Sequence, residues 1–325
     1  MATYKGINGF AVQSVASDPS PSDEGQVWYN NATYAFKLAS VTTAGTWAAG
    51  GNLSTGRSEI SGTGTQTETV AFGGYAGAAS SATEEYNGTS WSGGGSLNTA
   101  RYAVGAAGTQ TSALAFGGGT DGPVTGATEL YNGTSWTNNP NSMATARYGL
   151  GGCGTQTAAL GFGGSTLPPF SNLTEEFTGT TWTSGGNLSA AKIYVGGTGT
   201  QTAALCFGGL LPPVTGVTES YNGTSWTTLP ATMNTPRGYL AGAGTQTATV
   251  AFGGNTSAPA VTDATELWNG STWTSNPNSM ATARNLLGGA GTQTSAIGFG
   301  GSPNRTNTEE FTGPGVPQTK TITTS

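Results

Sequence analysis

Adjacent glutamates at three places along the chain are the clearest candidates for acid–base chemistry. Each pair follows a threonine, and the pairs are Glu84-Glu85, Glu175-Glu176 and Glu309-Glu310. Two carboxylates that face the same substrate can act as acid and base in glycoside hydrolysis. The pattern around these pairs predicts strands, however, and adjacent residues of a strand point to opposite faces. The two carboxylates of a pair therefore cannot share a substrate.

Histidine is absent from the 325 residues, which excludes several kinds of catalytic site. General-base mechanisms that rely on histidine, including the Ser-His-Asp triad, are excluded. The acids Asp23, Asp121 and Asp263 are isolated and lack metal-ligand spacing. Cys153 and Cys206 have no CxxC spacing, and we interpret them as small buried thiols. We expect no enzymatic activity, no catalytic or metal-binding residue and no cofactor.

Six of the ten cationic residues occupy one position of a repeating pattern, seven residues before the tetrapeptide GTQT. Each repeat also contains one Thr-Glu pair. We hypothesise that each cation forms an ion pair with a repeat glutamate, for example Arg101 with Glu129 or Glu84. Such a partly buried pair would be costly to break on one side. The six structural cations are Arg57, Arg101, Arg147, Lys192, Arg237 and Arg284.

The tetrapeptide GTQT marks a repeat of 44 to 47 residues, and a fixed period indicates an architecture of repeated units. It begins at Gly64, Gly108, Gly154, Gly199, Gly244 and Gly291. Each copy is followed by Phe-Gly-Gly, a variable stretch, Thr-Glu and an aromatic residue. The last repeat ends at Phe311-Thr-Gly-Pro, whereas an unmatched Trp47 precedes the first. The other five repeats each continue to a tryptophan: Trp91, Trp136, Trp182, Trp226 and Trp273.

One repeat contains four short strands separated by glycine and asparagine turns, at 102–107, 112–116, 127–131 and 134–137. The second strand is apolar on both faces, as expected between two neighbouring sheets. The first is rich in glycine and alanine, which suits a crowded centre. We predict an all-β, six-bladed β-propeller. The strand that carries Trp47 would complete the last blade and leave no edge strand unpaired.

The glycine pair, the later aromatic residue, the tryptophan and the basic residue of the next unit resemble the kelch family of β-propellers over residues 47 to 313. This resemblance implies an architecture but no function. Kelch-like copper oxidases need histidine ligands, which this chain lacks. Propeller sialidases use an arginine cluster with acidic and tyrosine partners, whereas six of the ten cations here belong to the repeat. A glycan-processing propeller enzyme is kept as an alternative.

The stretch between the glycine pair and Thr-Glu differs from repeat to repeat. In a four-stranded meander this loop shares a face with the connections between blades. Divergent loops on a rigid scaffold often carry recognition, although loops also diverge where nothing constrains them. Proline pairs at 168–169 and 212–213 stiffen two of the loops, which lowers the entropy lost on binding. We predict that the aromatic and aliphatic side chains of these loops are exposed. The predicted binding residues are Tyr75, Asp121, Leu167, Phe170, Leu210, Leu211 and Asp263.

Residues 1–44 lie outside the repeat and are predicted to form an anchoring arm, followed by the propeller at 45–313 and a C-terminal tail at 314–325. The proline-rich residues 18–24 lead into GQVWYN and YAFKL, which predict an aromatic hairpin. GQVWYN with this lead-in is similar to the openings of tailed-phage structural and fibre proteins. The resemblance implies attachment to a particle, through the predicted anchoring residues Trp28, Tyr29, Tyr34 and Phe36.

Charge and hydropathy restrict the partners. The formal net charge is −6 and no stretch is rich in lysine or arginine, so we expect no nucleic-acid partner. Apolar runs fall far short of the ~20 residues that a membrane span needs, and MATYKGINGF has no signal core.

We expect a non-enzymatic virion protein, either a tail fibre, an appendage or a capsid decoration, assembled in the host cytoplasm. Its expected partners are other virion proteins, a host-surface glycan or protein, and further copies of itself. A bacterial surface or scaffold propeller unrelated to a virus is the alternative.

Overall fold

The computed structural model describes residues 12–18, 26–41, 44–257, 260–315 and 317–322, and these residues form strands and turns but no helix. The chain divides into two compact units. The repeat unit is Thr46–Thr312, and the terminal unit joins Met1–Gly45 to Gly313–Ser325. The terminal segments that were predicted as separate parts of the chain therefore belong to one unit.

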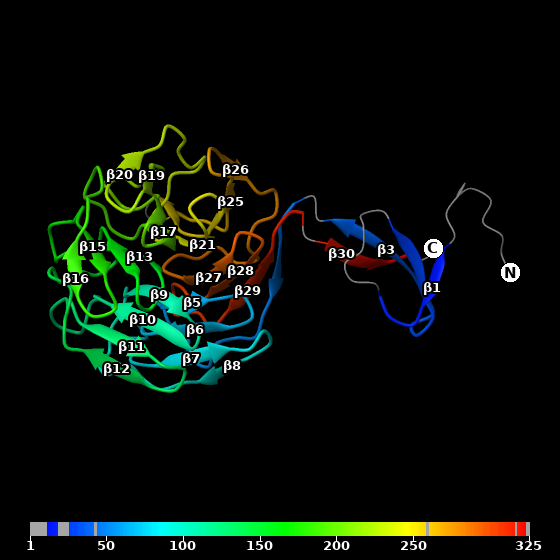
Figure 1. The fold of residues 1–325 in the computed structure, drawn as a ribbon, viewed down its shortest axis with the longest axis horizontal. Coiled ribbons are helices and arrows are strands. Elements are labelled where there is room, and N and C mark those ends of the chain that lie inside the picture. Colours follow the sequence, from blue (N-terminus) through cyan, green and yellow to red (C-terminus); the bar gives the residue numbers. More distant parts are fainter. Residues whose placement is uncertain (1–11, 19–25, 42–43, 258–259, 316, 323–325) are drawn as a thin grey trace. The chain divides into compact units, whose positions relative to one another are not determined.

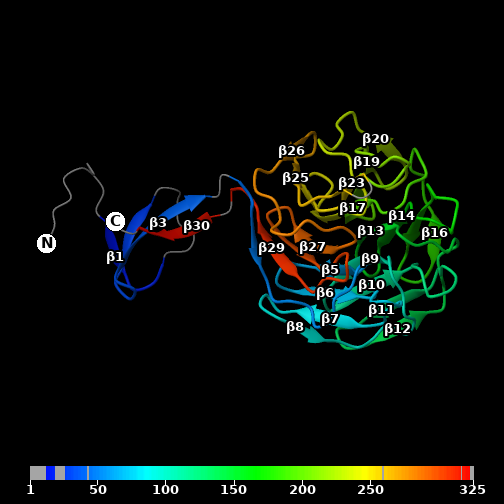
Figure 2. The same ribbon diagram turned by 180° about the vertical axis from the view of Figure 1, so that it is seen from behind.

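Four-stranded antiparallel sheets recur through the repeat unit, one for each GTQT segment (Figures 1 and 2). The first three sheets contain β5 (Ser61–Gly64), β6 (Thr69–Phe72), β7 (Thr83–Tyr86) and β8 (Trp91–Gly93); β9 (Gly105–Thr109), β10 (Ser112–Phe116), β11 (Thr128–Tyr131) and β12 (Trp136–Asn139); and β13 (Gly151–Gly154), β14 (Ala159–Phe162), β15 (Thr174–Phe177) and β16 (Trp182–Ser184). The next three contain β17 (Gly196–Thr200), β18 (Ala203–Phe207), β19 (Thr218–Tyr221) and β20 (Trp226–Thr228); β21 (Ala241–Gly244), β22 (Thr249–Phe252), β25 (Thr265–Trp268) and β26 (Trp273–Ser275); and β27 (Gly288–Thr292), β28 (Ser295–Phe299), β29 (Thr308–Thr312) and β4 (Thr46–Ala49). A small hairpin of β23 (Asn255–Ser257) and β24 (Ala260–Val261) extends the loop between β22 and β25. This all-β arrangement is consistent with a propeller-like fold.

The first strands of the sheets lie around a common centre in Figure 1, and the last strands lie at the periphery. Neighbouring first strands contact one another in the order β5, β9, β13, β17, β21 and β27, and β27 contacts β5. A Cβ atom at Gly105 would lie 2.2 Å from the ring of Phe116, and one at Gly152 would lie 2.7 Å from the carbonyl oxygen of Ala106. Glycine at these positions therefore makes room for the ring of Phe116 from the second strand and allows the close approach of the neighbouring first strands β9 and β13.

The second strands form the core between neighbouring sheets. All four residues of β6 and all four of β14 are buried. In β10, for which the apolar pattern predicted burial on both faces, Ala113 to Phe116 are all buried as well. This confirms the prediction, because a strand with a sheet on each side buries both of its faces.

Trp47 belongs to the sheet of the last repeat. Its strand β4 pairs antiparallel with β29, and Trp47 lies opposite Phe311, as the tryptophan spacing predicts. Trp47 Nε1 donates to Thr265 Oγ1 of the preceding sheet at 2.9 Å, and its ring lies 4.9 Å from that of Phe252. The other repeat tryptophans donate to the equivalent threonine: Trp91 to Thr308, Trp136 to Thr83, Trp182 to Thr128, Trp226 to Thr174 and Trp273 to Thr218.

Each repeat cation forms a buried ion pair with the glutamate of its own sheet, which confirms the predicted pairing. Arg101 Nη2 lies 2.7 Å from Glu129 Oε1, so Glu129 rather than Glu84 is its partner. Arg101 Nη1 also donates to two backbone carbonyl oxygens that flank the variable loop, and Glu129 Oε2 accepts from the N–H of Asn98. The pair thus joins the loop to the connection between sheets. The other pairs are Arg57–Glu84, Arg147–Glu175, Lys192–Glu219, Arg237–Glu266 and Arg284–Glu309.

The second glutamate of a Thr-Glu-Glu segment contacts the next repeat instead. The hydroxyl of Tyr131 donates to Glu85 Oε1 at 2.6 Å, whereas Glu84 of the same strand faces Arg57. Tyr221 and Tyr86 make the same contact with Glu176 and Glu310. Each carboxylate therefore has its own structural partner, and the two point to opposite sides of the strand as predicted.

The terminal unit is a sheet with the strand order β1-β2-β3-β30, formed by β1 (Gln13–Val15), β2 (Val27–Asn30), β3 (Ala35–Val41) and β30 (Pro317–Thr321). The antiparallel pair β2 and β3 confirms the predicted hairpin. β30 pairs with β3, so residues 314–325 supply a strand and are not a separate tail. No local pattern signals this pairing, because its partners lie at opposite ends of the chain. Residues 19–24 of the proline-rich lead-in, with Asp23, lie outside the described residues.

Candidate functional site

The chain makes the same three-residue connection between each repeat cation and the first strand of its sheet. The second residue of each connection has a positive φ angle, for example 50° at Ala103 and 54° at Tyr194. Its N–H donates to the carbonyl oxygen of the equivalent residue one repeat earlier, as from Ala103 to Glu59 at 2.9 Å. The N–H of Glu59 in the first repeat donates to the carbonyl oxygen of Leu286 in the last repeat at 2.8 Å, which closes the set. We call this hydrogen-bonded set the axial ring: Glu59, Ala103, Gly149, Tyr194, Tyr239 and Leu286.

The axial ring lies on the face that carries the variable loops. Isolated β-bridges join the connections to these loops, for example Ser58 to Tyr75 and Tyr102 to Gly119. Connections and variable loops therefore lie side by side, as the meander predicted.

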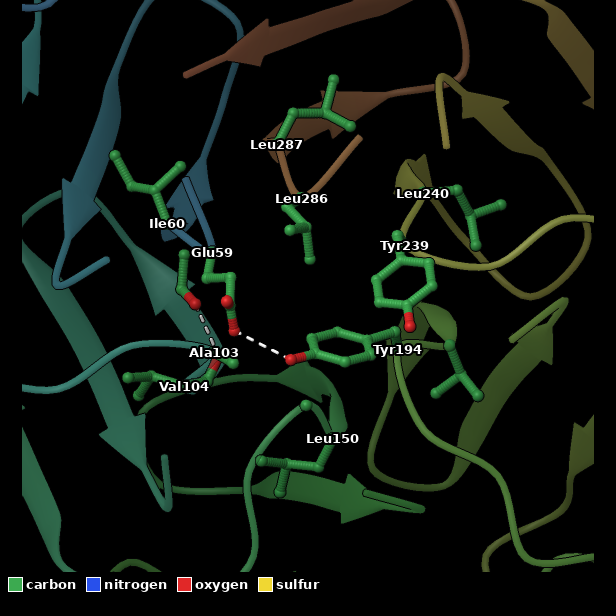
Figure 3. A pocket seen from close by; sticks show the side chains of 13 residues that line it. Glu59, Ile60, Ala103, Val104, Leu150, Tyr194, Tyr239, Leu240, Leu286 and Leu287 are labelled. Carbon is green, nitrogen blue, oxygen red and sulfur yellow. Dashed lines mark hydrogen bonds between the residues drawn. The ribbon is translucent and has the colours of Figure 1, made fainter. Parts of the chain in front are cut away.

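A cavity of about 110 Å³ lies at the axial ring (Figure 3). Glu59 and Tyr194 point toward each other there, and Tyr239 and Leu286 lie beside them. All four side chains are partly exposed, so a ligand could reach them. The third residue of every connection is a buried aliphatic residue that also lines the cavity. We call this set the aliphatic collar: Ile60, Val104, Leu150, Val195, Leu240 and Leu287.

Glu59 and Tyr194 are joined by a hydrogen bond in which the tyrosine hydroxyl donates to Glu59 Oε2 at 2.9 Å. Burial raises the pKa of Glu59, and the hydrogen bond from Tyr194 opposes part of this rise. Burial and the charge of Glu59 raise the pKa of Tyr194 far above its usual range. Tyr194 is therefore a neutral donor at physiological pH. The ion pairs found among the described residues do not include Glu59.

Five tyrosines form a continuous row from the variable loop of the first repeat to the cavity. We call this row the tyrosine arc: Tyr75, Tyr102, Tyr148, Tyr194 and Tyr239. Consecutive ring centroids are 5.7, 6.3, 6.1 and 4.4 Å apart. The first three contacts are edge-to-face, a favourable arrangement for aromatic pairs. The arc offers aromatic faces and hydroxyl groups beside one carboxylate.

The predicted loop residues occupy several places on this face. Tyr75 joins the tyrosine arc, and Asp121 accepts a hydrogen bond from the N–H of Ala79, which links two variable loops. Leu167 and Leu211 are exposed, by 48% and 38%.

The prediction of exposed side chains was wrong for Phe170 and Leu210, which are only partly exposed. Both form backbone bridges, with Ser165 and with Ile193, that fold their loops back onto the scaffold. Asp263 is also partly buried, and it contributes its backbone carbonyl oxygen to a bond with Met280.

The predicted anchoring residues divide into buried and exposed ones. Trp28 is fully buried and donates its indole N–H to Asp18 Oδ1, so it forms the core of the terminal unit rather than a contact surface. Tyr34 and Phe36 are 81% and 41% exposed, and Tyr29 packs against Phe36 with 5.1 Å between ring centroids.

Sequence reasoning missed five residues of the site: Glu59, Tyr102, Tyr148, Tyr194 and Tyr239. A signal for them exists, because the third residue after each repeat cation is always aliphatic while the first two differ between repeats. The predicted strand at 102–107 also included Tyr102 and concealed this connection. In the structure β9 begins at Gly105, and Ala103 has left-handed backbone geometry.

No group of three or more His, Cys, Asp or Glu side chains in the described ranges could hold a metal ion. In the same part of the chain, no helix is long and apolar enough to cross a membrane. No protein-family model matches the sequence, and no curated protein matches it. Function therefore has to be inferred from the geometry of the site.

Proposed function

We propose that this chain is a non-enzymatic binding protein of a phage virion. In this proposal a closed, six-bladed propeller of the kelch type presents its variable-loop face to a host-surface glycan or protein. The terminal unit attaches the chain to the particle. The observation that carries the proposal is the tyrosine arc, which places five aromatic side chains in a row on the variable-loop face.

Hydrogen bonds that pass from each sheet to the preceding one support the closed ring. The glutamine of GTQT makes such bonds, as when Gln110 donates to the carbonyl oxygens of Thr69 and Tyr86. Gln66 of the first repeat donates in the same way to Ala296 and Phe311 of the last. In the axial ring, the N–H of Glu59 in the first repeat likewise donates to the carbonyl oxygen of Leu286 in the last. Six repeats that each bond to the one before, with the first bonded to the last, favour six blades around one axis.

The chemistry of the arc supports recognition. Tyrosine provides a large, rigid contact surface with a polar tip, and it is enriched where proteins bind partners. Tyr102 and Tyr148 occupy the first position of two successive connections, and Tyr194 and Tyr239 occupy the second position of the next two. Four consecutive repeats therefore contribute one tyrosine each. A scaffold held by buried ion pairs presents these rings in a fixed geometry, which lowers the entropy lost on binding.

The same geometry favours binding over catalysis. The repeat glutamates are engaged in buried ion pairs or in bonds to tyrosine hydroxyls. Among the residues that line the cavity, Glu59 has no cation and no second carboxylate beside it, and the hydroxyl of Ser61 donates to the backbone carbonyl oxygen of Val104. Glycoside hydrolysis, the enzymatic alternative, uses a pair of carboxylates at the scissile bond.

Adhesion to host cells tests the binding role. The double variant Tyr102→Ala with Tyr148→Ala removes two rings of the arc, and we expect it to fold normally and to lose most of its adhesion. Thr111→Ala is the matched control, because Thr111 is exposed in a GTQT turn at the opposite ends of the strands. Equal adhesion of both variants would contradict a binding role for the arc.

Co-sedimentation with virus particles tests the attachment role. Tyr34→Ala with Phe36→Ala removes two exposed rings of the terminal unit and leaves the buried Trp28 in place. We expect this double variant to be lost from purified particles, whereas Asn31→Ala, an exposed turn residue of the same unit, is retained. A wild-type protein that stays with the cell envelope and never with particles would identify a bacterial surface propeller instead.

A further inference from the structure

Glu59 is a charged group whose charge the described structure leaves uncompensated. Six buried glutamates of the repeat each have a cation at 2.7 to 3.1 Å. Glu59 is partly exposed and accepts one hydrogen bond from a neutral hydroxyl, that of Tyr194. Glu85, Glu176 and Glu310 also accept from tyrosine hydroxyls, but they do not line the cavity. Moving a carboxylate out of water without a counter-charge is unfavourable, and burial raises its pKa accordingly. A positively charged ligand would remove this penalty.

The walls around Glu59 restrict what that ligand could be. An anion would be repelled by the carboxylate. A hard metal ion needs several oxygen ligands, whereas the cavity offers one carboxylate and tyrosine hydroxyls above an aliphatic collar. A neutral sugar would need convergent donors and acceptors, but the N–H and C=O groups of the axial ring already bond to one another. An organic cation with apolar substituents fits all of these surfaces.

The aromatic rings suit such a cation. Tyr194 and Tyr239 line the cavity together with Glu59, and their ring centroids lie 4.4 Å apart (Figure 3). A cation within about 6 Å of a ring centroid is attracted by the negative face of the ring. Leu286 and the aliphatic collar would contact the methyl or methylene groups around the charge. The volume of about 110 Å³ is large enough for a group of several heavy atoms and too small for a bulky ligand.

We propose that the cavity at the axial ring binds an alkylammonium group, with a quaternary trimethylammonium as the best fit. The cationic nitrogen lies beside the carboxylate of Glu59 and against the outer side of the packed Tyr194–Tyr239 pair, because rings 4.4 Å apart leave no room between them, and its methyl groups contact Leu286 and the collar. This assignment rests on the proposed function, because it names the chemical class that the binding face recognises. The group could belong to a choline ester of a host surface or to a lysine side chain of a host protein.

Titration calorimetry of the full chain tests the assignment with three small probes. Choline represents the quaternary group, n-butylammonium represents a lysine side chain, and 3,3-dimethylbutan-1-ol is the neutral isostere of choline. We expect choline to bind and the isostere to bind at least about tenfold more weakly, a difference of about 1.4 kcal/mol. Stronger binding of choline than of n-butylammonium indicates the ester as the source, and the reverse order indicates lysine.

Two variants identify the groups responsible. Glu59→Gln keeps an acceptor for the hydroxyl of Tyr194 but removes the charge, and we expect at least about tenfold weaker binding of choline. Tyr239→Leu introduces leucine at a position of the axial ring, and the equivalent position in the last repeat already carries leucine, Leu286. We therefore expect this variant to fold, and to bind choline more weakly because it lacks the aromatic ring. Glu68→Gln is the matched control, since it makes the same change at an exposed carboxylate that does not line the cavity, and its binding should match the wild type.

Equal affinity for choline and its isostere, or unchanged binding by the Glu59→Gln variant, would overturn the assignment. The absence of binding by both ammonium probes would overturn it as well. If adhesion to host cells still depends on Tyr102 and Tyr148 in that case, the proposed function stands without the ammonium site. Conversely, ammonium binding that depends on Glu59, together with adhesion that is insensitive to the arc, would retain the site and contradict the proposed function.

Discussion

The hydroxyl of Tyr194 donates to Glu59 Oε2 at 2.9 Å although 135 residues separate the two in the chain. Glu59 belongs to the connection of the first repeat and Tyr194 to that of the fourth, so the contact spans half of the repeats. A repeating scaffold brings equivalent positions together at its centre. Different side chains at those positions then create a site that no single repeat contains.

Replacement of Glu59 by glutamine is expected to stabilise the free protein at neutral pH. Burial raises the pKa of folded Glu59 above its ordinary value of 4.5, so the folded protein holds this proton more tightly than the unfolded chain does. Ionisation therefore lowers the free energy of unfolding as the pH rises from 4.5 through the higher folded pKa. Glutamine cannot ionise, and the variant avoids this loss.

Thermal unfolding of the wild type and the Glu59→Gln variant at about pH 4 and about pH 8 measures this effect. The variant should melt at a higher temperature at the higher pH and at nearly the same temperature at the lower pH. Glu68→Gln is the control, because Glu68 is exposed, and it should show little difference at either pH. A Glu59→Gln variant that is less stable than the wild type at both values would show that Glu59 has a structural role.

Much of the fold could be predicted because its determinants recur. GTQT, the repeat cation and the repeat tryptophan each appear six times once Trp47 is counted, so the place of the Trp47 strand and a cation–glutamate pairing could be predicted from spacing. Spacing did not decide between Glu84 and Glu129 as the partner of Arg101. The proposed binding site could not be predicted in the same way, since the six equivalent positions that include Glu59, Tyr194 and Tyr239 carry no residue type common to all repeats. The strand β30 was missed because its partner β3 lies at the other end of the chain.

Trp47→Ala is expected to destabilise the repeat unit by about 3 kcal/mol, as removal of a packed aromatic side chain does. Trp182→Ala is the matched comparison. Trp182 is also partly exposed, donates to Thr128 Oγ1 at 2.9 Å, and packs against Phe116 and Phe177 at 4.9 and 5.1 Å. Urea denaturation should give similar losses for both variants. A negligible loss for Trp47→Ala alone would show that β4 contributes little to the last sheet.

Glu129→Gln is expected to cost about 3–5 kcal/mol, because it leaves the cation of Arg101 buried without a counter-charge. Arg101 is fully buried, and burial lowers its pKa while the carboxylate of Glu129 opposes this shift. The free energy of unfolding in urea measures the loss. Replacing both residues with aliphatic ones should cost less than the single change, since the uncompensated charge is then absent. Unchanged stability of the Glu129→Gln variant would show that the ion pair is not a structural lock.

The polar contact between Glu85 and Tyr131 can be replaced by the apolar pair that occupies the equivalent positions one repeat later. Leu130 stands at the position equivalent to Glu85, and Phe177 at the position equivalent to Tyr131. Leu130 packs against the hydrophobic cluster that contains Phe177. Glu85→Leu alone should cost about 1–3 kcal/mol, because it leaves the hydroxyl of the fully buried Tyr131 without an acceptor. Adding Tyr131→Phe should restore most of this loss.

A double-mutant cycle in urea measures the coupling between the two positions. We expect a coupling energy of about 1–2 kcal/mol, with the double variant close to the wild type, because neither an unpaired hydroxyl nor an unpaired carboxylate then remains. Purely additive losses would show that the hydroxyl finds another acceptor. Coupling of the expected size would establish that each interface between sheets tolerates either a Glu–Tyr or a Leu–Phe pair. The repeats could then diverge at one face while the scaffold that positions Glu59 and the tyrosine arc stays intact.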